Sequence, residues 1–281
     1  MFSGGETRAA AGIGRREVVL WLVVALLGHQ LFALPAETIG QYTEGLQGLL
    51  ASKSIFYYIA WYAVFRLVAD SSRTAPATIT DIVFASAAIT LHFLSARSVP
   101  WMALGLSGIY LAARSHGDAA LAAAGAVLLA LAFNGFWGPT LFDMFAYHLL
   151  RADAALVGAA LTASQSGITW SETVIGSAGG HSIIIYRPCS SFHNISLGLL
   201  CWVSLTKLAR PQWTQSDIWV GALVCAAVVA LNASRLYLMA LSGESFAYWH
   251  HGTGQQVFAW TTTLTVLVFS LWGALRVGHT P

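Results

Sequence analysis

The chain has 281 residues, of which 57% are hydrophobic and only 9% are charged, and its formal net charge is +2. A soluble domain carries about 25% charged residues, so this chain has too little charge to cover a water-facing surface. The basic residues are scattered singly, which argues against nucleic-acid binding. We therefore predict a polytopic membrane protein with no room for a large soluble domain.

A transmembrane helix needs about 17–25 largely apolar residues. Eight stretches approach this length, which predicts an all-α polytopic membrane protein with about eight transmembrane helices. The first follows Arg15 and Arg16. We interpret it as a retained helix, because it lacks the small-x-small site of a cleaved signal peptide. The predicted spans are 18–35, 50–69, 79–95, 99–113, 118–135, 190–207, 216–238 and 255–274.

A different kind of sequence separates the fifth span from the sixth. Four polar residues interrupt 139–162, which predicts an amphipathic helix lying at the membrane interface. In 166–187, SGITWSETVIGSAGGHSIIIYR, small and polar residues mix with short β-branched runs. This composition predicts a small extended or hairpin element. The four interrupting residues are Asp143, His148, Arg151 and Asp153.

The Lys/Arg bias predicts the orientation. With the N-terminus inside, nine basic residues belong to the inner side and five to the outer side. Eight spans return the chain to its starting side. We therefore predict a multi-pass protein of the cytoplasmic (inner) membrane with both termini in the cytoplasm. The inner residues are Arg8, Arg15, Arg16, Arg66, Arg73, Arg114, Lys207, Arg210 and Arg276, and the outer ones are Lys53, Arg97, Arg151, Arg187 and Arg235.

This topology brings reactive residue types to one outer face. Cys189 lies at the outer mouth of the sixth span. The seventh span carries Asn232 and Arg235 to its outer end, three residues apart on one helical face. The loop before the eighth span holds His250 and His251. A cysteine, an arginine and a histidine are thus expected at one depth.

These three residue types suffice for acyl transfer. A histidine can take the proton of a thiol and return it to a leaving amine, and an arginine can stabilise an oxyanion. Each residue also has a structural interpretation, since membrane cysteines are commonly small hydrophobes and arginines near helix ends reach the headgroups. We assign that structural interpretation to Cys201 and Cys225 within the spans, and an interfacial anchor to Arg187. The odd number of cysteines, three, without paired spacing argues against a disulfide framework.

Three motifs occur in a fixed order: RPCSS at the start of a span, LNASRLYL near the end of the next, and HHGTGQQVF before the last. Through them the chain resembles the exosortase/archaeosortase family of multi-pass membrane cysteine transpeptidases, most strongly over 134–275. The resemblance implies an N-terminal transmembrane bundle over 1–135 and a catalytic membrane region over 136–281, together one integrated domain.

Matched residue by residue, the resemblance places Cys189 on the family's nucleophile, Arg235 on its essential arginine and His250 on its essential histidine. Arg235 would stabilise the oxyanion or the thiolate, and His250 would act as general acid and base. The chain departs from the family pattern at Ser191, where a glycine is common, and at His251, where an acidic residue is common. The supporting residues are Asn232, His251, Arg187, Ser190 and Gly254.

The resemblance also implies a substrate class. The expected partners are exported proteins with a C-terminal tail made of a recognition motif, a transmembrane helix and a basic cluster, often of the PEP-CTERM type, together with membrane lipids. The active site would lie on the outer face and need neither cofactor nor metal. Transfer to an amine and simple hydrolysis both remain open, as do three rival interpretations: a transporter, a non-catalytic scaffold of an export or polysaccharide assembly, and a metal site on the clustered histidines.

Overall fold

The computed structural model of the protein describes residues 13–32, 54–71, 76–94, 98–115, 117–177 and 180–276. Both termini and one end of each of the first three predicted spans lie outside these ranges. The same is true of four basic residues used to predict the orientation, namely Arg8, Lys53, Arg73 and Arg97.

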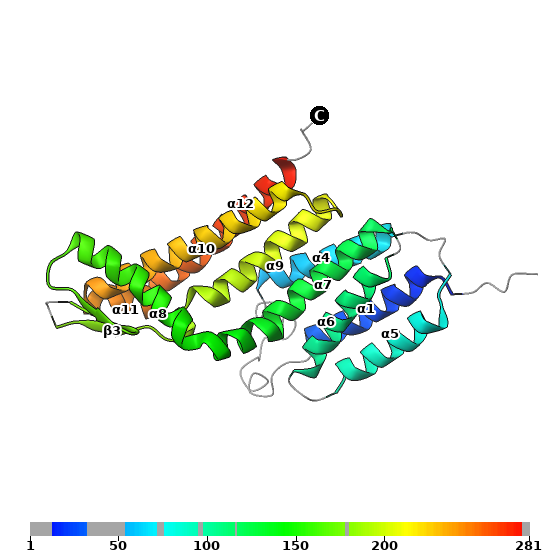
Figure 1. Ribbon diagram of the computed structural model, residues 1–281, viewed down its shortest axis with the longest axis horizontal. Coiled ribbons are helices and arrows are strands. Elements are labelled where there is room, and N and C mark those ends of the chain that lie inside the picture. Colours follow the sequence, from blue (N-terminus) through cyan, green and yellow to red (C-terminus); the bar gives the residue numbers. More distant parts are fainter. Residues whose placement is uncertain are drawn as a thin grey trace, which may run out of the picture.

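The described chain is mostly helical, and its helices pack side by side in an elongated bundle (Figure 1). Each predicted span coincides with one helix. In the first half these helices are α1 (Arg15–Phe32), α4 (Ile55–Asp70), α5 (Ile79–His92), α6 (Val99–Ala113) and α7 (Ala119–Ala132). In the second half they are α9 (Ser191–Ala209), α10 (Gln215–Leu241) and α12 (Thr253–Arg276).

The number of membrane crossings is not confirmed at eight. Within the described ranges, three helical stretches are long and apolar enough to cross a membrane, judged by length and composition alone. They are Ala119–Ser164, Gln215–Leu241 and Thr253–Arg276. Helices α5 and α6 have 14 and 15 residues. At a rise of about 1.5 Å per residue, such helices are shorter than the hydrocarbon layer of about 30 Å.

The joint after α7 differs from the sequence prediction, which ended one helix at 135 and began another at 139. A π-helical turn, Phe133–Trp137, joins α7 directly to α8 (Gly138–Ser164). Its wider turn is closed by the Gly138 N–H, which donates to the carbonyl of Phe133. The combined helix has 46 residues and bends at the joint (Figure 1). A straight helix of that length would measure about 69 Å, more than twice the hydrocarbon layer of about 30 Å, and the bend shortens this span.

The predicted extended element is a three-stranded antiparallel sheet at one end of the bundle (Figure 1). Its strands are β1 (Thr169–Ser171), β2 (Val174–Gly176) and β3 (Ser182–Ile184). The sheet order is β1-β2-β3, with Ile175 opposite Ile183. Because side chains alternate along a strand, these two isoleucines point to the same face and are buried.

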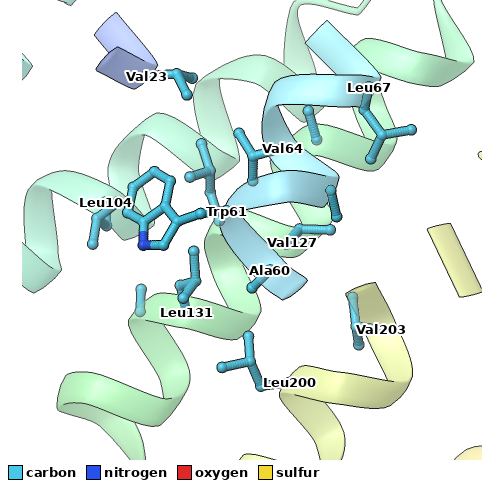
Figure 2. Close-up of a cluster of buried hydrophobic side chains, with 14 of the residues drawn as sticks. Val23, Ala60, Trp61, Val64, Leu67, Leu104, Val127, Leu131, Leu200 and Val203 are labelled. Atoms are coloured by element: carbon cyan, nitrogen blue, oxygen red, sulfur yellow. The ribbon is translucent and has the colours of Figure 1, made fainter. Parts of the chain in front are cut away.

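Two hydrophobic clusters hold the structure together. The larger one fills the bundle, where Trp61 of α4 lies beside Leu104 of α6 (Figure 2). It includes Leu200 and Val224, so the two predicted regions 1–135 and 136–281 share one core. The smaller one, here named the end cluster, joins α8, the sheet and the last turns of α10. Its buried members are Ala154, Val157, Leu161, Ile175, Ile183, Ile185, Cys189, Leu236, Met239 and Ala240.

A buried amide links the π-helical turn to the neighbouring helices. Asn134 is 5% exposed. Its side-chain oxygen accepts a hydrogen bond from Tyr57 of α4, and its Nδ2 donates to the Ser196 hydroxyl of α9 at 2.8 Å. An unpaired polar group at such a site would be costly, so these bonds fix the start of α9 against the joint.

A substitution at Gly158 tests the packing of the sheet on α8. A Cβ added at this glycine would lie 2.5 Å from Cγ of Trp170 in β1. We expect Gly158→Val to push the sheet off the helix and to lower the free energy of unfolding by about 1–3 kcal/mol. The control is Gly243→Ala, because nothing lies within 4 Å of a Cβ there. Thermal unfolding in detergent measures both, and equal melting temperatures would contradict this packing.

Candidate active site

Cys189 ends a short 3-10 turn, Arg187–Cys189, directly before α9. Its N–H donates to the carbonyl of Tyr186 at 2.8 Å. Ser190 caps the helix, because its hydroxyl accepts the N–H of Phe192 at 3.2 Å. The cysteine is 5% exposed and belongs to the end cluster. The turn and the cap together place the thiol at the amino end of a helix.

A buried polar network holds the chain on both sides of this cysteine. Nδ2 of Asn232 donates to the Cys189 carbonyl at 2.9 Å and to the Ser191 hydroxyl at 3.1 Å. Ser191 donates to both carboxylate oxygens of Asp153, from its hydroxyl at 2.7 Å and from its N–H at 3.1 Å. Asn232 is 1% exposed and Ser191 is 4% exposed. The network therefore joins α8, α9 and α10 around the thiol.

Arg235 lies one turn after Asn232 on α10 and presents free donors beside the cysteine. Its Nε donates to the carbonyl of Trp249 at 3.1 Å, and its guanidinium lies 4.8 Å from the ring centre of Phe258. Its two terminal nitrogens have no hydrogen-bond partner within the part of the chain that the structure describes. The N–H groups from Cys189 to Phe192 are already bonded. The terminal nitrogens of Arg235 thus remain available to an oxyanion.

Burial raises the pKa of the Cys189 thiol above that of a free cysteine. The hydrogen bond with the Tyr186 backbone and the positive charge of Arg235 lower this pKa, and the negative charge of Asp153 raises it. Desolvation prevails, so the thiol is protonated at neutral pH. A base is therefore needed before this sulfur can act as a nucleophile.

His250 lies near the arginine and makes no hydrogen bond with the cysteine. It belongs to α11 (Gly243–His251), and its ring stacks on Phe246 with centres 4.8 Å apart. Burial, the adjacent His251 and the charge of Arg235 lower the pKa of His250, which favours its neutral, proton-accepting form. Among the described residues, no hydrogen bond joins either histidine to the Cys189 thiol. The structure thus brings together Cys189, Asn232 and Arg235, and leaves the histidines at the side of this group.

The other residues predicted to support the site make contacts that stabilise the fold or lie at the surface. Arg187 is exposed, pairs with Asp143 at 2.7 Å, and lies over the ring of Phe142. His251 is exposed, next to the partly buried His250. Gly254 is buried where a Cβ would lie 2.7 Å from the ring of Tyr248, so the close approach of α11 to α12 requires a glycine.

Asp153 and Ser191 are the site residues that the sequence did not identify. In the sequence, Asp153 interrupts the amphipathic stretch and Ser191 departs from the family pattern, and neither feature indicates a place in the site. The signal at Ser191 was a pair of serines at the start of a predicted helix, which is typical of an N-terminal cap. Within the described ranges no three His, Cys, Asp or Glu side chains are grouped as metal ligands.

No family model, curated protein or solved structure matches the chain. The resemblance to exosortases therefore rests on the three motifs themselves, and the activity that it implies is a proposal.

The pH dependence of thiol alkylation tests the charge environment of Cys189. Because Arg235 stabilises the thiolate, Arg235→Gln should raise the pKa of Cys189 further and slow its alkylation at pH 8 about threefold. Arg235→Lys keeps the charge and should retain most of the wild-type rate. Mass spectrometry of the Cys189 peptide after maleimide treatment measures the rate. Faster alkylation in Arg235→Gln would contradict this electrostatic role.

Proposed function

We propose that the protein is a membrane-embedded cysteine transpeptidase or protease that removes the C-terminal sorting signal of exported proteins through a thioacyl intermediate. The main support is the placement of Arg235, which offers two free donors beside a cysteine at a helix start. The carbonyl of that cysteine accepts a hydrogen bond from Asn232, which lies on α10 together with Arg235. This bond fixes the position of α10, and with it Arg235, relative to the cysteine. The family resemblance supplies the reaction class.

The first half-reaction forms a thioester. The Cys189 sulfur attacks the carbonyl carbon of the scissile peptide bond as its proton passes to His250. Arg235 stabilises the negative charge that develops on the carbonyl oxygen, where preorganised donors contribute most to the rate. The carbon–nitrogen bond then breaks, and His250 returns the proton to the leaving amine of the tail.

The second half-reaction releases the protein. An amine or a water molecule loses a proton to His250 and attacks the thioester carbonyl. The carbon–sulfur bond breaks, and the thiol of Cys189 recovers its proton. An amine acceptor makes the enzyme a transpeptidase, and water makes it a protease.

Helix lengths support a site at the membrane surface. Helix α10 has 27 residues, and at about 1.5 Å per residue it is longer than the hydrocarbon layer. Arg235 and the end cluster lie at its carboxyl end, where the helix can extend beyond the lipid. We place this end on the outer face of the cytoplasmic membrane, with lipids around the bundle. An exported substrate anchored by its own tail helix would present its scissile bond at that level.

His250 must approach the thiol before reaction. Catalytic hydrogen bonds are often long in enzymes without substrate and shorten in the complex. Helix α11 has nine residues, none of them buried, and it is held to α10 through Ser245 and Trp249. We propose that a docked substrate brings α11 toward Cys189, with the Arg235 contact to Trp249 guiding the approach.

Loss of the substrate tail tests the nucleophile. A tagged exported protein with a motif, a transmembrane helix and a basic cluster, encoded by the same genome, is coexpressed with each variant. Wild type should remove the tail and form a hydroxylamine-sensitive adduct. Cys189→Ala should abolish both, and Cys189→Ser should lower the rate at least about a thousandfold. Matched controls are Cys201→Ala and Cys225→Ala. Equal tail loss in wild type and Cys189→Ala would contradict the mechanism and favour a scaffold.

The two histidines can be separated by single substitutions. His250 is partly buried and within the electrostatic influence of Arg235, whereas His251 is exposed. We expect His250→Gln to slow tail release about a hundredfold or more, because a general base typically contributes this much. His251→Gln should change the rate less than about fivefold on the same scale. The gel-shift assay with the same substrate measures both, and the reverse order would assign the base to His251.

A further inference from the structure

We propose that Asp153 is a positioning residue for Cys189, which fixes the turn that carries the thiol and places a negative charge opposite that of Arg235 beside it. The catalytic meaning of this assignment rests on the proposed function. Its effect on the reactivity of the thiol does not.

A continuous chain of hydrogen bonds leads from this carboxylate to the cysteine. Both oxygens of Asp153 accept from Ser191, at 2.7 and 3.1 Å. The Ser191 hydroxyl accepts from Asn232 at 3.1 Å, and the same Asn232 nitrogen donates to the Cys189 carbonyl at 2.9 Å. The hydroxyl has one proton to give, and only an acceptor such as a carboxylate can receive it while the amide donates from the other side. The carboxylate therefore determines which group donates and which accepts in each of these hydrogen bonds.

Ser190 alone does not satisfy the unpaired N–H groups at the start of α9, and Asp153 accepts one of them, the N–H of Ser191, at 3.1 Å. Ser190 already serves as the N-cap through its bond with the Phe192 N–H. Asp153 comes from another helix, 38 residues earlier in the chain. The adjacent Ala154 and nearby Val157 are fully covered members of the end cluster, so the carboxylate lies at the edge of an apolar region. A charge in such surroundings is costly unless it is hydrogen-bonded, and the two bonds from Ser191 stabilise this carboxylate.

The charges around the thiol show what the carboxylate does there. Helix α10 contributes the positive charge of Arg235, α8 the negative charge of Asp153, and α11 the imidazole of His250. Other titratable groups nearby are Tyr186 and Arg187 before the cysteine and His193 after it. Tyr237 and His181 contact the end cluster, to which the sheet contributes the apolar Ile183. Asp153 raises the pKa of Cys189 and opposes the effect of Arg235. The carboxylate thus adds to the effect of burial and partly offsets the stabilisation of a thiolate by the arginine and the helix start.

The consequence is selective reactivity. A permanent thiolate on the outer face of a membrane would react with oxidants and other electrophiles. A protonated thiol reacts only when a carbonyl and a base are both in place. In the Asp153 variant without the charge, the thiol should therefore be more reactive toward a small reagent and less effective toward the substrate.

The test compares two carboxylates on one helix. Asp153→Asn keeps the shape of the side chain and removes its charge. Asp143→Asn makes the same change at the residue that pairs with Arg187, and Asp143 has no part in the network. The rate of maleimide labelling of Cys189 in membranes is followed by mass spectrometry from pH 6 to 10. We expect Asp153→Asn to label at least about threefold faster at pH 7, with a profile moved to lower pH. Asp143→Asn should match the wild type.

Tail release gives the second readout. Asp153→Asn should release the substrate tail about tenfold more slowly despite its more reactive thiol, because displaced reacting groups lose rate. Merely loosened packing would also slow release, but Asp153→Glu distinguishes the two effects. It disturbs the geometry and keeps the charge, so it should slow release and retain the wild-type pH profile. It also replaces Asp153→Asn as the decisive variant if the asparagine protein does not fold.

An unchanged labelling profile in Asp153→Asn would overturn the inference, as would a profile moved to lower pH in Asp153→Glu. Either result counts whether or not the protein cleaves a substrate. If instead the profile moves as expected while Cys189→Ala still removes the tail, the proposed function is wrong and the electrostatic role of Asp153 remains.

Discussion

The amide of Asn232 is the contact on which the arrangement of the site depends. It lies inside the protein at 1% exposure, and a buried amide without partners would cost about 1–3 kcal/mol. Its two acceptors, the Cys189 carbonyl and the Ser191 hydroxyl, lie on either side of the start of α9. Satisfying this one group therefore fixes the rotation and the height of α10 against that turn. Arg235 follows one turn later on the same face, so its guanidinium is placed by the same constraint.

A second constraint comes from length. Helix α10 and the combined helix of α7 and α8 have 27 and 46 residues, and both exceed what a bilayer of about 30 Å can cover. The carboxyl ends of α8 and α10 lie at one end of the bundle, where the sheet lies against them (Figure 1). The end cluster is the small core that this meeting creates, and Cys189 is one of its members. The thiol is therefore buried by protein side chains of α8, of the residues around the sheet and of α10.

The sequence was informative where neighbouring spans impose proximity. The start of one span and the end of the next lie at the same depth, so Cys189 and Arg235 were predicted to share a face from topology, and the structure brings them together. It was uninformative where the contact depends on side-chain direction. Asp153 contacts Ser191, 38 residues later in the chain, where α8 follows a π-helical turn. No periodic pattern in the sequence predicts that turn. The carboxylate of Asp153 resembled the polar face of an interfacial helix. The sequence also could not predict the distance between the His250 imidazole and the thiol. Topology places the histidine on the same side as Cys189, but it does not determine where the ring lies.

The signs of the two pKa shifts determine how the proton must move in the proposed reaction. Burial raises the pKa of Cys189 and lowers that of His250, so both groups are neutral at rest. A preformed ion pair would require the opposite signs, a lowered cysteine and a raised histidine. With neutral partners, transfer of the proton is most favourable as the new bond to the carbonyl carbon forms, because the oxyanion that develops is then stabilised by Arg235. Nucleophile, base and oxyanion donor are therefore effective together or not at all, and recognition of the substrate becomes part of the activation of the thiol.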